Sequence, residues 1–397
     1  MNIIGVWMKM TSRLALVAAA GVLIGAAMTP AQAADLGKEC CADLEERVAE
    51  LEATTARKGN RVVSLQVTGQ VNKALLLFDD GVESDAFIVD NDQSGTRIGF
   101  KGLAEIRPGW KAGFNMELDI QDAASDKVSQ GDDEGGADEI KIRQNYVYIE
   151  SERYGRLSLG QQSSATDGIN EIVLGNSITD SSDIFSSFKV RTASGGDSGL
   201  AVGQFVDNFD GPREDVVRYD SPSIYGFIVS ASWGDNDFAD VALRFKKEWN
   251  SIRFAAGAGY QMFSADAGDR EILSGSFSAM HIPSGLYFAV SGGNVTFADD
   301  TEEGSFYYGQ LGIDRKLLPY GSTTIYADYG VYDGVSNEDP ALNGLEAERF
   351  GFGVVQRIDS VAMDVYALAR IYSFENGAVA EDLEDFSTVL IGTRIKF

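Results

Sequence analysis

The sequence is short of several residue types, and each shortage removes a class of protein. It has a single histidine, His281, and neither an orienting acid nor an oxyanion loop that would complete a hydrolase site around it. Its two cysteines, Cys40 and Cys41, are adjacent, which excludes a disulfide framework and any zinc-site spacing. Proline is scarce at 7 residues while glycine reaches 44, a composition that suits long strands joined by flexible turns.

Positive charge is also scarce, with 33 Lys and Arg against 60 Asp and Glu and a formal net charge of −27. Nucleic-acid binding needs a basic face, so we expect no nucleic-acid partner. Long hydrophobic runs are absent too: the longest, Leu14–Met28, is shorter than the roughly 18 residues of a membrane-spanning helix. With 44% apolar residues, two classes are left, a soluble secreted β protein and an outer-membrane barrel.

The run Leu14–Met28 is typical of an export signal. Lys9 and Arg13 precede it, and Ala31-Gln32-Ala33 supplies a small-residue cleavage site. We therefore predict that residues 1–33 are a signal peptide, with translation beginning at Met8 or Met10.

Residues 34–60 have a different, helical pattern. Apolar residues recur there at alternating three- and four-residue spacing, at Cys41, Leu44, Val48 and Leu51. Such a seam of about two heptads is too short for a stable lone helix. We predict a short periplasmic helix that either lies on another surface or forms a parallel coiled coil between protomers, in which case Cys40 and Cys41 could form interchain disulfides.

The clearest strand signal is WKAGFNMELDIQ, residues 110–121, in which apolar and polar residues alternate without a break. At about 3.3 Å per residue this stretch reaches about 40 Å, which suits a tilted strand crossing a bilayer. In EIKIRQNYVYI, residues 139–149, the same pattern predicts Tyr146 and Tyr148 on the apolar face with Ile140 and Ile142.

The alternation continues to the C-terminus. The sixteen predicted strands are 61–78, 94–107, 110–121, 139–149, 156–162, 213–221, 224–234, 239–249, 252–263, 272–282, 286–298, 306–317, 322–332, 346–358, 361–373 and 387–397. Short turns alternate with long acidic loops, as in outer-membrane barrels whose long loops face outward from the cell. We predict an all-β, sixteen-stranded antiparallel transmembrane barrel over 61–397, and the even count places both termini in the periplasm.

Aromatic residues near the strand ends suit interfacial girdles, although aromatics are enriched in strands generally. These residues are Phe78, Trp110, Tyr146, Tyr148, Trp233, Trp249, Tyr260, Phe263, Tyr307 and Tyr308. His281 shares its register with Leu273 and Phe277 next to a turn, so we expect it at the membrane interface.

Five segments in order resemble the trimeric Gram-negative porins of the sixteen-stranded, alphaproteobacterial general type. They are YVYIESERYGRLSLGQQ (146–162), REDVVRYDSPSIYGF (213–227), FSAMHIPSGLYF (277–288), LLPYGSTTIYADYG (317–330) and TVLIGTRIKF (388–397). The resemblance covers about 61–397 and implies a homotrimer in the outer membrane. It also implies that the terminal Phe397 is the signal read by the barrel-assembly machinery.

The resemblance implies a passive, weakly selective channel for small hydrophilic solutes and ions, with no enzyme activity and no cofactor. Residues 163–211 would be a third loop that folds inward and narrows the pore. Its acidic side would be Asp167, Glu171, Asp180 and Asp183, and the facing basic wall Lys73, Arg97, Lys101, Lys111 and Arg143. A transverse field between the two would orient dipolar solutes.

Two other functions stay open at this point. A channel specific for sugars or phosphate would need a ladder of aromatics or arginines along the lumen, and the sequence shows mixed charges. A structural barrel could instead tether the envelope through residues 34–60. The acidic outer loops would contact lipopolysaccharide, with divalent cations between them, or would merely be solvated.

Overall fold

A computed structural model of the chain describes residues 62–135, 140–235, 237–265, 268–297, 303–335, 344–376 and 381–397. The predicted signal peptide, the helix at 34–60 and both cysteines lie outside these residues. No helix among the described residues is long and apolar enough to cross a membrane.

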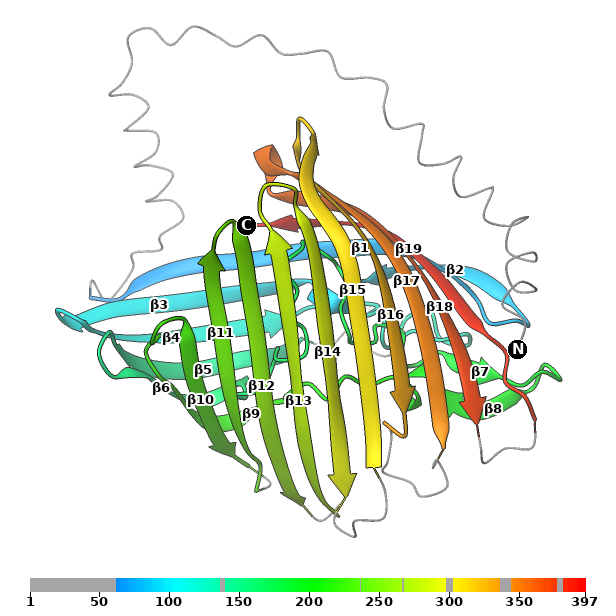
Figure 1. Ribbon diagram of the computed structural model, residues 1–397, viewed down its shortest axis with the longest axis horizontal. Helices are drawn as coiled ribbons and strands as arrows, with labels where there is room; N and C mark the ends of the chain where they lie inside the picture. Colours follow the sequence, from blue (N-terminus) through cyan, green and yellow to red (C-terminus); the bar gives the residue numbers. More distant parts are fainter. Residues whose placement is uncertain are drawn as a thin grey trace, which may run out of the picture. The chain divides into compact units, whose positions relative to one another are not determined.

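Antiparallel strands form the wall of the molecule (Figure 1). They are β1 (Ser64–Asp79), β2 (Ser84–Asp90), β3 (Arg97–Arg107), β4 (Trp110–Asp119), β5 (Lys141–Ser151), β6 (Gly155–Ser163), β9 (Arg213–Asp220), β10 (Phe227–Gly234), β11 (Ala239–Trp249), β12 (Ile252–Ala265), β13 (Gly268–His281), β14 (Leu286–Phe297), β15 (Glu303–Leu318), β16 (Gly321–Asp333), β17 (Leu345–Ile358), β18 (Met363–Asn376) and β19 (Phe386–Lys396). β2 and β3 both pair with β1. From β3 onward each strand of this sheet pairs with the next one in chain order, and β19 pairs back onto β1, so the sheet closes on itself.

The seventeen segments of this sheet make sixteen crossings of the wall. β1 pairs with β2 along its second half and with β3 along its first half, so β2 and β3 are two parts of one crossing. The 3-10 turn η2 (Asp92–Ser94) interrupts them. All sixteen predicted strands correspond to crossings in the structure, and the fold prediction is confirmed.

The outer face of the wall is apolar and the inner face is not. On β17, Phe350 and Phe352 are 52% and 48% exposed, whereas Arg349, which directly precedes Phe350, is fully buried. A sheet of a water-soluble protein would present the opposite pattern. The alternation therefore places apolar side chains toward lipid and polar ones toward the interior of the barrel.

The prediction that Tyr146 and Tyr148 of β5 lie on the apolar outer face is wrong. Tyr146 pairs with Asn115, and Tyr148 with Gly113, both on the inner face of β4. The register shifts between Glu117 and Leu118, where a β-bulge inserts one extra residue in β5 and reverses the alternation after it. Both tyrosines thus face inward and do not belong to the lipid girdle.

The other predicted girdle aromatics divide between the two faces. Trp233, Trp249 and Tyr307 are exposed on the outer face, as expected. Phe78 and Tyr308 are buried inside the barrel. His281 is exposed beside the turn after β13, where its Nδ1 lies 2.8 Å from the Ser284 hydroxyl, and its position at the membrane interface stays a prediction.

Several inward tyrosine rings closely approach a glycine of the next strand. Tyr326 faces Gly353, and a Cβ atom at that glycine would be 2.2 Å from the Tyr326 ring. Tyr366 and Gly392 repeat the arrangement, at 2.5 Å. The close approach of ring and backbone explains why these two positions are glycine.

The long connection between β6 and β9, residues 164–212, is named the inner loop here. It was predicted to lack strands, yet it contains a small hairpin, β7 (Lys189–Arg191) and β8 (Asp197–Ala201), and the 3-10 turn η3 (Val202–Gln204). A further 3-10 turn, η5 (Asp359–Val361), lies between β17 and β18.

Candidate functional site: the inner wall and the inner loop

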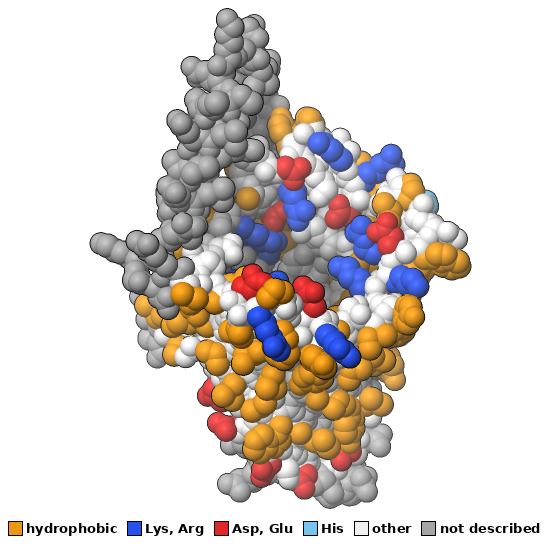
Figure 2. Space-filling view, turned by 90° about the vertical axis from the view of Figure 1, so that its left-hand side faces the viewer, with side chains coloured by type: hydrophobic (Ala, Val, Ile, Leu, Met, Phe, Trp, Pro, Cys, Tyr) orange, Lys and Arg blue, Asp and Glu red, His pale blue; other side chains and the backbone are white. Residues whose placement is uncertain are grey.

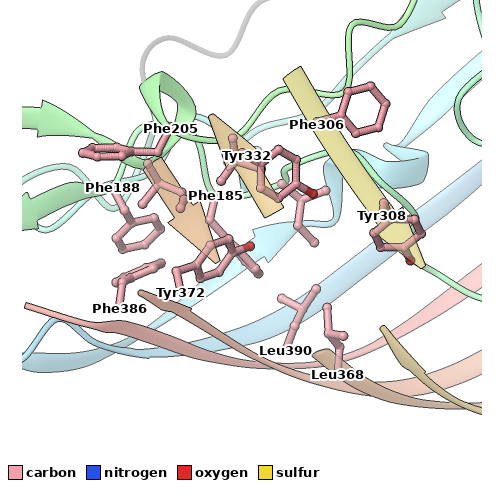
Figure 3. Close-up of a cluster of buried hydrophobic side chains, with 14 of the residues drawn as sticks. Phe185, Phe188, Phe205, Phe306, Tyr308, Tyr332, Leu368, Tyr372, Phe386 and Leu390 are labelled. Atoms are coloured by element: carbon pink, nitrogen blue, oxygen red, sulfur yellow. The ribbon is translucent and has the colours of Figure 1, made fainter. Parts of the chain in front are cut away.

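The inner loop packs against the inner face of the wall. Phe185, Phe188 and Phe205 are fully buried, and Figure 3 shows them among Tyr372 and Phe386 of β18 and β19. The Phe188 and Phe386 ring centroids are 5.0 Å apart, and those of Phe185 and Tyr372 are 6.5 Å apart. The loop is therefore held along this wall by a continuous apolar contact.

Polar contacts follow the same route along the wall. The Asn170 amide donates to Ser274 of β13 at 3.0 Å, and the Leu174 N–H donates to Ser278 at 3.1 Å. Farther on, the Thr179 hydroxyl lies 3.0 Å from the Tyr326 hydroxyl of β16. The loop thus crosses the inner face from β13 to β19.

Two fully buried arginines hold the middle of the loop. Arg349 of β17 donates to the carbonyl oxygens of Asp180 and Ser182, each at 2.7 Å. Arg370 of β18 donates to the same two carbonyls, at 3.2 and 3.3 Å. Asp328 of β16 lies 3.7 Å from the Arg349 Nε atom and supplies the opposite charge. We call Arg349 and Arg370 the loop anchor.

Two of the predicted loop acids belong to this anchored region. The Tyr372 hydroxyl donates to the Asp183 carboxylate at 3.0 Å, and the Gln93 amide donates to that of Asp180 at 2.6 Å. Burial raises the pKa of both acids, while the guanidinium groups of the loop anchor oppose this effect. Asp180 and Asp183 therefore bind the loop to the wall instead of facing the lumen.

The other two predicted acids lie near the start of the loop. Asp167 forms an ion pair with Arg213 at 3.3 Å. The charge of Asp180 and then burial raise the pKa of Glu171 well above its ordinary value. Asp210, which sequence reasoning missed, accepts the Gly168 N–H at 2.7 Å, and burial followed by the charge of Asp167 raises its pKa as well.

Four of the five predicted basic residues share the inner face. Arg97 and Lys101 of β3 and Lys111 of β4 have inward register, and Arg143 reaches inward from the bulge of β5. Glu117 lies between the two arginines, 2.9 Å from Arg143 Nε and 3.8 Å from Arg97 Nε. Of the four, only the two arginines are partly neutralised by this shared carboxylate.

Lys73 is the exception. Its neighbours on β1 with the same register, Val71 and Leu75, are exposed on the outer face. Its Nζ atom lies 2.7 Å from the fully buried Asp90 carboxylate and also binds Asp122. The structure therefore separates Lys73 from the other four bases. Because the wall is interrupted between β2 and β3, Asp122, which follows β4, can reach Asp90. This explains why Lys73, Asp90 and Asp122 form a polar cluster on the outer face.

Besides the loop anchor, three further inward arginines between β6 and β11 were missed by the sequence analysis. They are Arg156 of β6, Arg218 of β9 and Arg244 of β11. Arg218 donates to both oxygens of Asp220 and, at 2.7 Å, to the Ser164 carbonyl. Arg244 donates to the Asp167 carbonyl at 2.7 Å. The sequence pattern could have identified them, because each arginine alternates with outward apolar residues, as in GRLSLGQ.

Arg156 borders a recess in the inner wall. Its guanidinium carbon lies 3.8 Å from the Tyr148 ring centroid, and one of its nitrogens donates to the Tyr146 hydroxyl at 3.1 Å. The recess has a volume of about 220 Å³. Its lining residues are Gln144, Tyr146, Arg156, Ser158, Gln162, Ser163, Arg218 and Asp220. The wall here offers hydrogen-bond donors and acceptors to a small polar solute.

The strand order sets the two charged regions across the barrel from each other. Following the pairings around the wall, β3–β6 stand about half a circuit from β13–β17, along which the inner loop runs. Figure 2 shows a hollow bordered by basic and acidic side chains, with hydrophobic side chains over the outer surface below it. A water-filled passage between these regions would carry bases on one wall and the loop on the other.

The described residues hold no cluster of three or more His, Cys, Asp and Glu side chains suited to a metal ion. Phe397 forms two backbone hydrogen bonds with Gly69, and its exposed ring lies over that glycine on the outer face.

Comparison with known proteins gives one family. The profile of the family described as Gram-negative porin matches residues 15–376. Comparison with curated proteins finds no match.

Solved structures share the fold. An anion-selective porin from Comamonas acidovorans is 15% identical, with a TM-score of 0.60 over 84% of this chain and 100% of that one. A trimer form of Vibrio cholerae OmpT is 14% identical, with a TM-score of 0.56 over 85% and 100%. A Salmonella typhi OmpF complex with daunomycin is 12% identical, with a TM-score of 0.55 over 86% and 99%. At these identities the likeness concerns the barrel.

Proposed function

The chain belongs to the Gram-negative porin family and is an outer-membrane diffusion channel, and we propose that it is a general, weakly selective one whose selectivity arises between the basic wall and the inner loop. The observation that carries this proposal is the inner loop packed along β13–β19 opposite the inward bases of β3–β6. Small hydrophilic solutes and ions would pass between the two. Such a channel performs no chemistry, and its selectivity depends on width and field.

We assign the basic side of this passage to Arg97, Lys101, Lys111 and Arg143, and extend it with Arg156. Arg218 and Arg244 are left out because they donate to carbonyls at the start of the inner loop. On the loop side we assign Asp167 and Glu171, which lie near the start of the loop and away from the loop anchor. Opposed charges across a narrow water-filled gap create a field that favours dipolar solutes and disfavours apolar ones. Asp180 and Asp183 are left out because they are engaged by the wall.

Reversal potential in planar bilayers tests the assignment. Replacing Arg97 and Arg143 by glutamine should shift ion preference toward cations in a salt gradient, because Glu117 then keeps its charge without a basic partner. The matched control is Lys247→Gln, which removes one charge from an exposed position on the outer register of β11. An unchanged reversal potential in the double variant would contradict the assignment of Arg97 and Arg143 to the basic side of the passage. A current that a sugar or phosphate blocks would point to a solute-specific channel.

We also propose that the protein is a homotrimer. The Lys73, Asp90 and Asp122 cluster supports this, because charged groups on an outer wall are costly in lipid and are better placed against another protein surface. The trimer form of Vibrio cholerae OmpT is a precedent from a protein of the same fold. Native gels of the detergent-extracted wild type and of the Lys73→Leu variant would measure the oligomeric state. A wild-type monomer would refute it.

The proposed orientation has the short turns and both chain ends in the periplasm and the long loops outside. The even number of crossings puts both ends on one side, and short periplasmic turns are usual in such barrels. The acidic long loops would meet lipopolysaccharide through divalent cations. The exposed Phe397 ring would be available to the assembly machinery. Protease accessibility of loops in whole cells tests the orientation.

A further inference from the structure

The outer surface at the short-turn end carries two arginines without acidic partners. Arg107 ends β3, and Arg153 lies in the turn between β5 and β6, and both are exposed. Among the residues that the structure describes, neither guanidinium group forms an ion pair or a hydrogen bond. Glu152, next to Arg153 in the chain, is exposed and makes no ion pair with it.

Each of these arginines instead lies over an aromatic ring. The Arg107 guanidinium carbon is 5.1 Å from the Trp110 ring centroid, and that of Arg153 is 5.3 Å from the Tyr154 centroid. The two rings are 6.0 Å apart. A backbone hydrogen bond of 3.3 Å from Glu152 N to the Gly109 carbonyl joins the two turns. The four side chains form one arginine–aromatic patch.

An apolar surface continues from the patch along the barrel wall. Ile149 of β5 and Leu157 of β6 pair with each other on the outer face and are 48% and 55% exposed. The order along the wall is therefore cation, then aromatic ring, then aliphatic side chain. A phospholipid presents the complementary order of phosphate, interfacial glycerol region and acyl chain.

We propose that the arginine–aromatic patch, Arg107, Trp110, Arg153 and Tyr154, binds the headgroup of an anionic phospholipid from the inner leaflet of the outer membrane. The unpaired guanidinium groups would each donate to a phosphate oxygen, while the rings hold them in place. The acyl chains would lie on Ile149 and Leu157. The choice of leaflet rests on the proposed orientation, since lipid A phosphates occupy the opposite side.

Native mass spectrometry of the detergent-purified full chain tests this. Protein is titrated with phosphatidylglycerol, with phosphatidylcholine as the neutral comparison and lipid A as the outer-leaflet source. We expect phosphatidylglycerol to bind best, and the Arg107→Gln/Arg153→Gln variant to lose about tenfold in that affinity. The matched control is Arg315→Gln/Lys316→Gln, which removes two exposed charges from the end of β15 beside another short turn and should change the affinity less than twofold.

Three results would overturn the proposal. Equal losses in both double variants would mean that only general electrostatic attraction acts. Preference for lipid A would assign the patch to the wrong leaflet. The third result has two parts: no lipid binds in a patch-dependent way, and the Arg107→Gln/Arg153→Gln variant dissociates the oligomer. Together they would make the patch a subunit contact. Reversal potentials of the same variants, expected to equal wild type, separate failure here from failure of the channel assignment.

Discussion

Replacing Arg349 and Arg370 by glutamine should loosen the inner loop and widen the passage beside it. Together the two guanidinium groups donate to the carbonyls of Asp180 and Ser182 four times, over 2.7 to 3.3 Å. A hydrogen bond to a charged group contributes about 1.5–3 kcal/mol, so one such contribution from each arginine gives at least about 3 kcal/mol. That amount changes the ratio of docked to released loop about 100-fold.

The loop would not detach completely, because Phe185, Phe188 and Phe205 stay buried against the wall. We therefore expect higher mean single-channel conductance and larger current fluctuations in bilayers, as the loop samples released positions. Arg394→Gln is the matched control, since Arg394 is also inward and buried but pairs at 2.8 Å with Asp364 of the neighbouring strand. If the double variant folds and its conductance and noise equal those of the control, the anchoring argument is refuted.

Three further predictions concern packing, protonation and oligomer stability. Gly353→Ala should lower the midpoint of thermal unfolding in detergent, since its Cβ would meet the Tyr326 ring at 2.2 Å, whereas Gly309→Ala, with nothing within 4 Å, should leave it unchanged. The pKa of Glu171 lies above its unfolded value, so this group favours the folded chain at low pH and that contribution is lost as pH rises through the raised pKa. The same raised pKa affects ion preference. As the pH is lowered, the cation preference of wild type should begin to fall at a higher pH than that of Glu171→Gln, as reversal potentials would show. On unboiled gels, a trimer that resists heat unless reductant is present would support interchain disulfides between the paired cysteines, and indifference to reductant would argue against them.

Alternation alone predicts where the strands lie, because a barrel wall gives every strand one lipid face and one interior face. Trp110–Asp119 is strand β4 within two residues of its predicted end. The method fails where backbone pairing is irregular. At β5 a single bulged residue reverses the faces of Tyr146 and Tyr148, and nothing in the sequence of β5 marks the bulge.

Lys73 was misplaced for a different reason. In the second half of β1 both faces are apolar, because the inward Leu76 and Phe78 pack under the inner loop while Leu75 faces outward. The Phe78 and Phe188 ring centroids are 4.9 Å apart. A strand covered on its inner side by a loop loses the polar face that marks the lumen, so its register cannot be decided without the loop.

The same reasoning separates two kinds of inward arginine that the sequence does not distinguish. Arg97 and Arg349 occupy equivalent inward registers, yet the first is part of the basic wall and the second is fully buried under the loop. The chain charge of −27 is therefore a poor guide to ion preference, because acids such as Asp180 and Asp183 are engaged by the wall. Charges that the inner loop covers fix its position. Those it leaves uncovered are available to set the field. Ion preference should follow exchanges at Arg97 and Arg143, whereas exchanges at Arg349 should change conductance with little change in the sign of selectivity.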